Sequence, residues 1–380
     1  MLWLASHRTD DLVSTTAMSA PPLRVGLLGF GLAGRAFHAP LIAACPELVL
    51  TAVVTSDPAR RAALAAAYPG AAALDSADQL WDRADRLDLV VVATTNRSHA
   101  PLTRAALRAG LAVVIDKPFA VSAAEGRALI AEARAARRPL TVFQNRRWDG
   151  DFLTVRRLIS DGALGAVHRL ESRFERWSPA VRPGWRELGD PAEAGGLLFD
   201  LGSHLIDQAL QLFGPVGAVY GELDHRRPGA AIDDDAFVAL HHASGARSHL
   251  WMTKLAAQRA PRFRVLGAGA SYVKYGLDGQ ESAMSAGGIP GSAGWGEEPP
   301  ERWGQLGEDG AVRPVATVAG CYQRFYAEVA AAVRTGAPVP VDPADAVAGL
   351  DIIEAARASA ERGTVVALAQ DRTGQSCCDG

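Results

Sequence analysis

Short apolar runs alternate with helix-forming stretches through the first third of the chain, and this rhythm limits the possible folds more than any other feature. Strands are predicted at Leu23–Leu28, Leu48–Thr55, Leu87–Thr94, Leu111–Ile115 and Pro139–Phe143. Helices are predicted between them at Ala36–Ala44, Ala59–Tyr68, His99–Ala109 and Ala123–Ala136. Strands that alternate with helices in this way form right-handed βαβ units. We therefore expect an α/β fold that begins with a doubly wound parallel sheet.

The pattern changes after Gln144. Helices are predicted at Asp151–Ser160 and Leu201–Phe213. Alternating polar and apolar residues predict strands at Val167–Arg176, Val216–Asp224, Asp235–His242, Ala246–Leu255, Phe263–Leu266 and Ser271–Tyr275. Residues 278–312, rich in Gly, Pro and Glu, are expected to form a long surface excursion. Two helices and a short strand should close the fold, at Tyr322–Arg334, Pro343–Ala360 and Thr364–Leu368. This pattern indicates an α+β domain with an open, mainly antiparallel meander.

The composition narrows the class of protein. At 380 residues with 48% hydrophobic residues, the chain can bury two cores. The net charge of −3 and the spread of arginines argue against a nucleic-acid surface, and no apolar run is long enough to span a membrane. Charged residues interrupt the short apolar stretch in residues 1–20, so no signal peptide is predicted. Four cysteines without metal-ligand spacing fit a reduced cytoplasmic compartment and no metal site.

A glycine-rich turn follows the first predicted strand. Its sequence is Gly29-Phe30-Gly31-Leu32-Ala33-Gly34. In a dinucleotide-binding loop, the first glycine permits the tight turn, the second lets the backbone approach a pyrophosphate, and the third lets the helix pack on the strand. The following helix would present its positive dipole end to the phosphates. The loop predicts a Rossmann dinucleotide site; the alternative is a purely structural glycine turn.

The end of the second predicted strand favours NADP over NAD. NAD enzymes usually place a carboxylate there to hold the ribose diol. This chain has Thr55 and Ser56 instead, with Arg60 or Arg61 on the next turn, and these groups suit a 2′-phosphate. The alternative is that the two arginines lie on a solvated helix face.

Polar residues after the third predicted strand should line the same cleft. They are Thr94, Thr95 and Asn96, although Asn96 could instead cap the next helix. His99 is interpreted as structural or as packing against the cofactor.

Lysine is rare in this chain, which has only three among 39 Lys and Arg residues. One of them, Lys117, follows a predicted buried strand in the sequence Asp116-Lys117-Pro118, where an open α/β sheet places its ligands. A lysine pKa can be shifted by its surroundings, whereas a guanidinium stays charged. These properties make Lys117 a candidate catalytic residue.

Asp200 and His204 lie four residues apart after the double glycine Gly195-Gly196. On a helix they would share a face, and the carboxylate would orient the imidazole and favour its charged form. Such a pair can shuttle a proton near neutral pH. The alternative is an ordinary surface ion pair. Asp207, one further turn on, could face the same way.

These features together resemble the glucose–fructose oxidoreductase / inositol dehydrogenase / rhizopine-catabolism (Gfo/Idh/MocA) family, from about Leu23 to Leu368. Three segments are similar to the branch that contains NADP-dependent scyllo-inositol dehydrogenase: Phe37–Ile42, Asn145–Thr154 and Lys274–Glu281.

The resemblance implies roles for individual residues. Lys117 would lie between nicotinamide and substrate, and Asp200 and His204 would match the family's acidic residue and histidine. Trp185 and Arg186 would reach toward the cofactor. Asp116 and Asn145 are also assigned to the cofactor site, and Arg146 and Tyr275 to the substrate pocket, with plain packing as the alternative for the last two. Asp116 replaces the family's usual glutamate, and Gln144 stands where relatives often carry histidine.

We therefore predict an oxidoreductase that transfers hydride between NADP, or alternatively NAD, and a polyol or sugar-like secondary alcohol. A cofactor-dependent glycoside hydrolase and a non-catalytic dinucleotide sensor are the alternatives. The expected division is a disordered leader (1–21), an NAD(P)-binding Rossmann domain (22–143), a substrate-binding and oligomerisation α+β domain (144–369) and a polar tail (370–380). The expected assembly is a homodimer or homotetramer. His38 is predicted to pack in a helix, and Asp233-Asp234-Asp235 to form a solvated turn.

Overall fold

The computed structural model describes residues 20–181, 184, 187 and 189–368. Its first sheet has six strands in the order β3-β2-β1-β4-β5-β6, and every neighbouring pair is parallel. Their bounds are β1 (Leu23–Leu28), β2 (Leu48–Val54), β3 (Ala72–Leu74), β4 (Leu89–Val92), β5 (Ala112–Asp116) and β6 (Leu140–Phe143). The doubly wound parallel sheet is thus confirmed. The strand order reverses between β1 and β4, so ligands are expected at their carboxyl ends.

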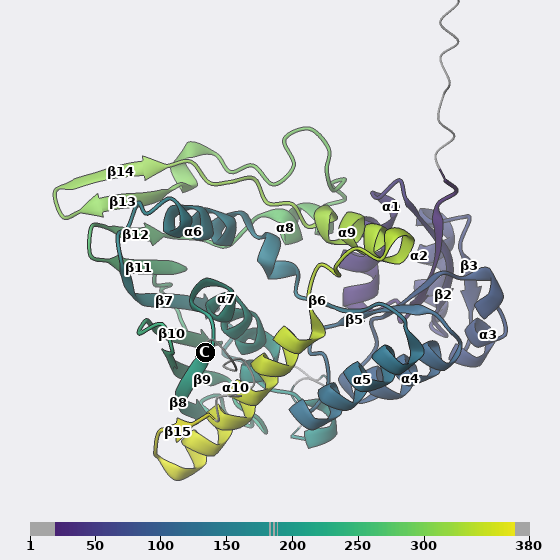
Figure 1. Ribbon diagram of the computed structural model, residues 1–380, viewed down its shortest axis with the longest axis horizontal. Helices are drawn as coiled ribbons and strands as arrows, with labels where there is room; N and C mark the ends of the chain where they lie inside the picture. The colour runs from purple at the N-terminus through teal and green to yellow at the C-terminus, as the bar shows by residue number, and fades with distance from the viewer. Residues whose placement is uncertain (1–19, 182–183, 185–186, 188, 369–380) are drawn as a thin grey trace, which may run out of the picture.

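Helices cover both faces of this sheet, with α4 and α5 below it and α1 and α9 above it in Figure 1. The helices of this part are a π-helical turn (Gly34–His38) continuing into α1 (Ala39–Ala43), then α2 (Pro58–Ala67), α3 (Ala77–Trp81), α4 (His99–Arg108) and α5 (Ala123–Ala136). Asp57, Ser76 and Ser122 cap α2, α3 and α5 by accepting backbone N–H bonds. The strands are apolar runs because both of their faces are buried.

The second sheet has nine strands in the order β14-β13-β12-β11-β7-β10-β9-β8-β15. Their bounds are β7 (Val167–Glu175), β8 (Val216–Asp224), β9 (Asp235–His242), β10 (Arg247–Thr253), β11 (Phe263–Gly267), β12 (Ser271–Lys274), β13 (Gly304–Glu308), β14 (Ala311–Val315) and β15 (Val366–Ala367). Most neighbours are antiparallel, which confirms the predicted sheet type. The central pair β7–β10 is parallel, so the sheet is not the simple meander that alternation suggested.

Residues 278–312 are mostly exposed, as expected of a surface excursion, but part of the segment is regular structure. They contain α8 (Gln280–Ser285), all of β13 and the start of β14, and the β13–β14 hairpin extends the sheet. Its strands carry glycine and proline, which lowers their local strand propensity, so cross-strand pairing decides their conformation.

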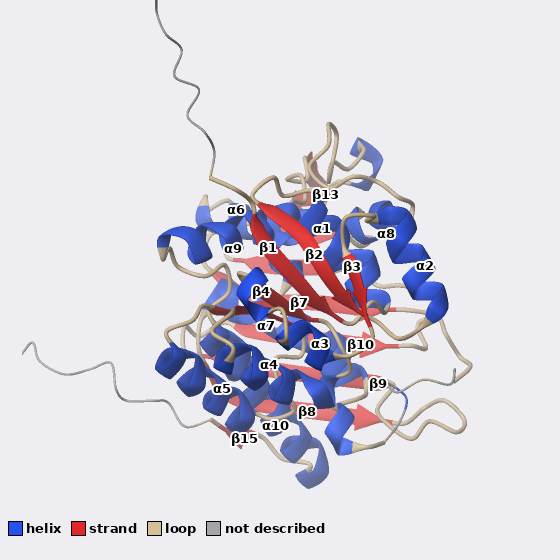
Figure 2. Cartoon of the chain, turned by 90° about the vertical axis from the view of Figure 1, so that its right-hand side faces the viewer, coloured by secondary structure: helices blue, strands red, loops and turns tan. Residues whose placement is uncertain are grey.

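Two closing helices join the two sheets. The helices of the second part are α6 (Gly150–Ser160), α7 (Ser203–Phe213), α9 (Gln323–Thr335) and α10 (Pro343–Arg362). The helix α10 packs against α5 of the first part and against α7 and β8 of the second. Thr141 at β6 donates its hydroxyl to Val341 O at 2.8 Å, which fixes the approach to α10. In Figure 2 the parallel strands run steeply while β8–β10 lie nearly horizontal, so the sheets face each other at an angle.

Asp233 and Asp234 are buried, so the predicted solvated turn is wrong. Asp233 accepts the backbone N–H of Leu198, and Asp234 pairs with Arg227 at 2.8 Å. Leu198 is 35 residues from Asp233 in the sequence and Arg227 is 7 residues from Asp234, and the alternation of polar and apolar residues marks neither pairing. Within the described residues, no helix has both the length and the apolar character needed to cross a membrane.

Candidate active site

Lys117 and Asp200 meet at the junction of the two sheets. The Lys117 side chain, directly after β5, donates from Nζ to Asp200 Oδ1 at 2.8 Å and to Asp200 O at 2.7 Å. The Lys117 side chain is 16% exposed, so the pair is shielded but reachable from solvent. A small pocket beside it is lined by Asn96, Lys117, Pro118, Gly195, Gly196 and Asp200, among others.

The second glycine of the pair, Gly196, is required by the turn that presents Asp200. Gly196 has φ +89°, and a Cβ there would lie 2.0 Å from Asp233 Oδ1. Asp233 in turn accepts from Leu198 N at 2.8 Å, at the start of a π-helical turn, Leu198–Gly202, that leads into α7. A π-turn is a frequent feature of functional sites because it moves side chains out of the α-helical register. Asp200 and His204 are therefore not separated by one regular α-helical turn, because Asp200 lies in the π-helical turn and His204 in α7.

His204 is buried in the first turn of α7 and is 5% exposed. Its Nδ1 has no hydrogen-bond partner among the described residues. Burial, followed by the positive charges of Lys117 and Arg146, holds the pKa of His204 well below its ordinary value, although Asp200 opposes this shift. Asp200 thus favours imidazolium as expected, but burial and the nearby cations outweigh its effect on the pKa of His204. A neutral imidazole is the form that can accept a proton.

The glycine loop has the geometry of a phosphate cradle. Gly29 has φ +94°, and a Cβ at Gly34 would lie 2.1 Å from Gly29 O, so both are needed for the turn and the close helix contact. At Gly31, by contrast, a Cβ would meet nothing within 4 Å. A glycine that the protein's own packing does not require leaves its backbone open to a ligand. The loop therefore fits a dinucleotide, and the alternative of a purely structural turn leaves Gly31 unexplained. Of the remaining loop residues, Phe30 is buried and Leu32 is exposed.

Asn96 connects the parallel sheet to the segment that precedes the double glycine. Its Nδ2 donates to Glu193 O at 2.7 Å and to Ala194 O at 3.4 Å, and the residue is buried. The residue before α4 is Ser98, and no side-chain cap is present there, so the capping alternative for Asn96 does not apply to α4. Thr94 and Thr95 lie on the same turn, where Ser98 Oγ donates to Thr94 Oγ1 at 2.8 Å.

His99 is structural. Its Nδ1 lies 2.9 Å from Pro118 O and its Nε2 lies 3.3 Å from Thr94 O, so the ring joins the ends of β4 and β5. Burial lowers the pKa of His99. The His99 ring thus fixes Pro118, the residue after Lys117, against the end of β4.

The end of β2 presents the groups predicted for the adenosine side. Thr55 is buried, whereas Ser56 and Arg60 are exposed. Arg61 is already bonded, to Asp75 and to the carbonyls of Thr55 and Ala73 at 3.4 and 3.3 Å. Of the two arginines, Arg60 is therefore the one available to a ligand.

Asp116 contacts His38, which is fully buried as predicted for a packing residue. His38 Nε2 lies 3.6 Å from Asp116 Oδ1, and His38 Nδ1 lies 2.6 Å from the Tyr326 hydroxyl on α9. Although burial raises the pKa of Asp116, the nearby His38 ring and the Lys117 ammonium lower it overall. Asp116, one methylene shorter than the family's usual glutamate, is thus held near His38 in the π-helical turn after the glycine loop.

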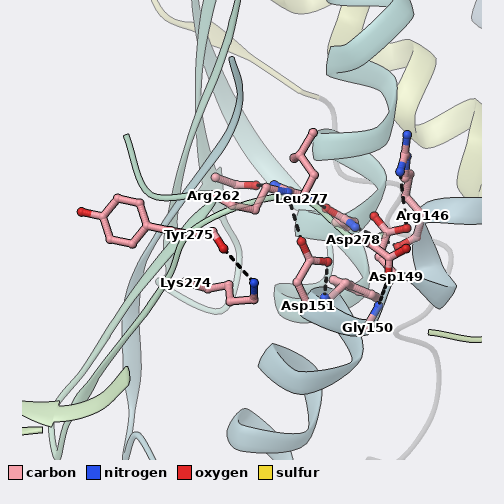
Figure 3. A network of polar contacts seen from close by, with 12 residues as sticks. Arg146, Asp149, Gly150, Asp151, Arg262, Lys274, Tyr275, Leu277 and Asp278 are labelled. Atoms are coloured by element: carbon pink, nitrogen blue, oxygen red, sulfur yellow. Dashed lines mark hydrogen bonds and ion pairs between the residues drawn. The ribbon is translucent and has the colours of Figure 1, made fainter. Parts of the chain in front are cut away.

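The other predicted residues are not all brought together. Asn145 and Arg146 are buried in a 3-10 turn (Asn145–Trp148), and Arg146 bonds Glu281 and the Tyr322 hydroxyl. Tyr275 is 61% exposed, and its ring points away from Arg146 in Figure 3, so the two predicted pocket residues do not face each other. Asp207 pairs with Arg147 at 2.6 Å and does not face the same way as Asp200. Trp185 and Arg186 lie outside the described residues.

Sequence analysis missed Phe174, Gln208 and Arg262. Phe174 packs edge-on against the His204 imidazole, and the buried Arg262 bonds Gln208, one turn after His204 on α7. No composition signal marks these residues, because Phe174 and Gln208 lie in ordinary amphipathic elements and Arg262 lies in the turn before β11. In the described part of the chain, no cluster of three or more metal-ligating side chains occurs.

Comparisons with known proteins agree with this geometry. Residues 23–144 match the model of an oxidoreductase family's NAD-binding Rossmann fold, and residues 156–368 match that family's C-terminal alpha/beta domain. The chain is 39% identical to the oxidoreductase YdgJ of Escherichia coli, over 91% of this chain and 99% of YdgJ. It is 34% identical to the NADP(+) scyllo-inositol 2-dehydrogenase IolW of Bacillus subtilis, over 91% of this chain and 96% of IolW. Among solved structures, the oxidoreductase yvaA of Bacillus subtilis matches with TM-score 0.86 at 33% identity, over 92% of this chain and 99% of yvaA.

Proposed function

The chain belongs to the Gfo/Idh/MocA family of NAD(P)-binding oxidoreductases, and we propose that it is an NADP-dependent dehydrogenase of a polyol or sugar-like secondary alcohol. The observation that carries the proposal is the Lys117–Asp200 contact at 2.8 Å, beside a buried histidine and at the carboxyl end of the Rossmann sheet. We assign residues 22–143 to cofactor binding and residues 144–369 to substrate binding and oligomerisation, as a homodimer or homotetramer.

The site residues divide the proton chemistry between them. His204, neutral at physiological pH, accepts the hydroxyl proton when the alcohol is oxidised and returns it in reduction. Lys117 donates a hydrogen bond to the same oxygen and stabilises its developing negative charge. Asp200 holds the Lys117 ammonium in place and partly offsets the positive charge that faces His204. A bound nicotinamide would supply or accept the hydride.

Two observations support NADP. No carboxylate of β2 or the turn after it lies at the position of a diol-binding residue, since Asp57 caps α2 by accepting from Arg60 N. Arg60 and Ser56 are exposed at that turn. The relative IolW is an NADP(+) enzyme by name. The same relative supports a cyclic polyol as the first substrate class to test.

The test is a screen of inositols, aldoses and ketoses with NADP and NAD, following the absorbance of the reduced nicotinamide. Lys117→Met should retain NADPH binding and lose turnover by about a thousandfold or more. Arg324→Met, which removes an exposed i,i+4 ion pair with Glu328 on α9, is the control and should retain full turnover. Near-normal turnover of Lys117→Met would overturn the assignment.

Two other outcomes would identify a different function. Saturable NADPH binding without turnover of any substrate would indicate a dinucleotide sensor. Cleavage of glycosides without net production of NADPH would indicate a hydrolase that oxidises its substrate transiently.

A further inference from the structure

Arg262 is a buried cation close to the candidate active site. It lies directly before β11, and its side chain is 1% exposed. Nη1 donates to Ser172 Oγ at 2.5 Å and Nη2 donates to Gln208 Oε1 at 2.7 Å. Nε faces Asp151 Oδ2 at 3.5 Å, the ion pair drawn in Figure 3, but makes no hydrogen bond within the described part of the chain. The charge of Arg262 is therefore only partly neutralised.

The guanidinium of Arg262 stacks on the ring that supports His204. Its central carbon lies 4.2 Å from the Phe174 ring centroid, and that of Arg146 lies 5.5 Å from the same centroid. The Phe174 ring meets the His204 imidazole edge-on, with centroids 6.3 Å apart. Phe174 thus contacts both the imidazole and the two guanidinium groups. The packing of the cations on this ring therefore affects the position of the imidazole.

Arg262 also bonds the helical turn that follows His204. Gln208 lies one turn after His204 on α7 and is 1% exposed. Its Oε1 accepts from Arg262, and its Nε2 donates to Arg146 O at 2.9 Å. Arg262 therefore contacts two separate supports of His204, the aromatic ring on β7 and the next turn of α7.

The charges that face His204 are mostly positive. Lys117 after β5, Arg146 in the turn after β6 and Arg262 before β11 lower the pKa of His204, whereas Asp200 raises it, and Arg262 has the smallest effect of these four groups. The carboxylates of Asp149 and Asp151 partly balance the charges of Arg146 and Arg262. Together with burial, these cations hold the pKa of His204 well below its ordinary value. Arg262 contributes in the same direction as Lys117 and Arg146.

We propose that Arg262 is a positioning residue for His204: it stacks on the Phe174 ring that meets the imidazole and bonds Gln208 one turn further along α7, and its buried positive charge disfavours protonation of the ring. The consequence for catalysis rests on the proposed function, because it requires His204 to be the proton acceptor. The effect on the charge state of His204 does not depend on any activity.

The first test therefore uses histidine NMR signals of the cofactor-free protein, with the His204 signal identified by its absence in His204→Gln. Arg262→Met removes the charge and retains an apolar stem; we expect the titration midpoint of His204 to rise. Arg262→Gln, which is neutral but polar, should show the same rise and serves if the Met variant does not fold. Arg264→Met is the matched control, since Arg264 is an exposed arginine of β11, two residues after Arg262, and it should leave the midpoint unchanged. An unchanged midpoint in a folded Arg262→Met or Arg262→Gln protein overturns the proposal.

The second test separates the charge of Arg262 from its shape. In turnover assays, the acidic limb of kcat/KM should move upward in Arg262→Met and by the same amount as the NMR midpoint. Arg262→Lys keeps the charge but loses the planar stack and the paired bonds, so it should lower kcat without moving the limb. Equal limb shifts in the Lys and Met variants would contradict an electrostatic role. If the wild-type protein turns over no substrate, the proposed function fails, while the NMR result still decides the role of Arg262.

Discussion

The Lys117 ammonium donates to both the carboxylate and the main-chain carbonyl of Asp200, at 2.8 and 2.7 Å. These bonds join the end of β5 in the parallel sheet to the π-helical turn before α7 in the second part. Relative motion of the parallel sheet and the second part would therefore directly change the distance between Lys117 and Asp200. The contact makes correct docking of the two sheets a condition for an assembled site.

Asp200→Asn should lower turnover about a hundredfold while leaving NADPH affinity unchanged. The main-chain carbonyl of residue 200 would still accept from Lys117, so the loss should be smaller than in Lys117→Met. Because Asp200 raises the pKa of His204, its removal should also move any acidic limb of the pH profile to lower pH. Steady-state kinetics between pH 5 and 9 check both points, and a limb that moves upward would contradict them.

Two of the loop glycines, Gly31 and Gly34, should respond differently to alanine. Gly31→Ala should fold normally, since its Cβ would meet nothing within 4 Å, yet bind NADPH about tenfold or more weakly. Gly34→Ala should be destabilised by about 1–3 kcal/mol or more, because its Cβ would lie 2.1 Å from Gly29 O. Thermal unfolding and NADPH fluorescence titration separate these outcomes. Unimpaired NADPH binding by Gly31→Ala would show that the cofactor does not approach this turn.

Arg60→Ala should weaken NADPH binding by about tenfold and leave NADH binding unchanged, since a charge-assisted bond to a phosphate contributes about 1.5–3 kcal/mol. Arg61→Ala is an informative comparison because the Arg61 guanidinium bonds Thr55 O, Ala73 O and Asp75. It should affect the stability of the β2–α2 turn and weaken both cofactors alike. Isothermal titration with each cofactor measures the ratio, and an equal effect of Arg60→Ala on NADPH and NADH would exclude Arg60 from the 2′-phosphate site.

The protein should lose stability in acid partly through His204. In the unfolded chain this histidine takes up a proton near its ordinary pKa of 6.5, whereas burial in the folded chain holds its pKa well below that value. The unfolded state thus binds more protons as the pH falls below 6.5, and the free energy of unfolding decreases by about 1.4 kcal/mol per pH unit until the folded pKa is reached.

His204→Gln should therefore show a shallower loss of stability between pH 7 and pH 5 than the wild type. Urea unfolding at several pH values measures the difference in slope. His168→Gln, at an exposed position of β7, controls for the loss of a histidine as such. Parallel wild-type and His204→Gln profiles would mean that the folded and unfolded chains bind the His204 proton equally, so that folding does not lower the pKa of this histidine.

Local sequence patterns predicted most elements of the fold, and the failures have physical causes. Alternation identified the central strands β7–β12, because one face of each is buried and the other is not. It missed β3, whose Ala72-Ala73-Leu74 is too short to show a period, and the β13–β14 hairpin, whose glycines and proline have low strand propensity. The parallel β7–β10 pair was also missed, because pairing between distant segments leaves no local signal.

The sequence by itself determined the phosphate loop, the parallel sheet and the candidates Lys117, Asp200 and His204, since turn geometry and strand-end position depend on neighbouring residues. Only the tertiary structure decided the charge state of His204. That state depends on burial and on Lys117, Arg146 and Arg262, which approach from three different elements. The sequence suggested that the nearby carboxylate would favour imidazolium; the fold reverses this because desolvation and the added cations together outweigh one aspartate.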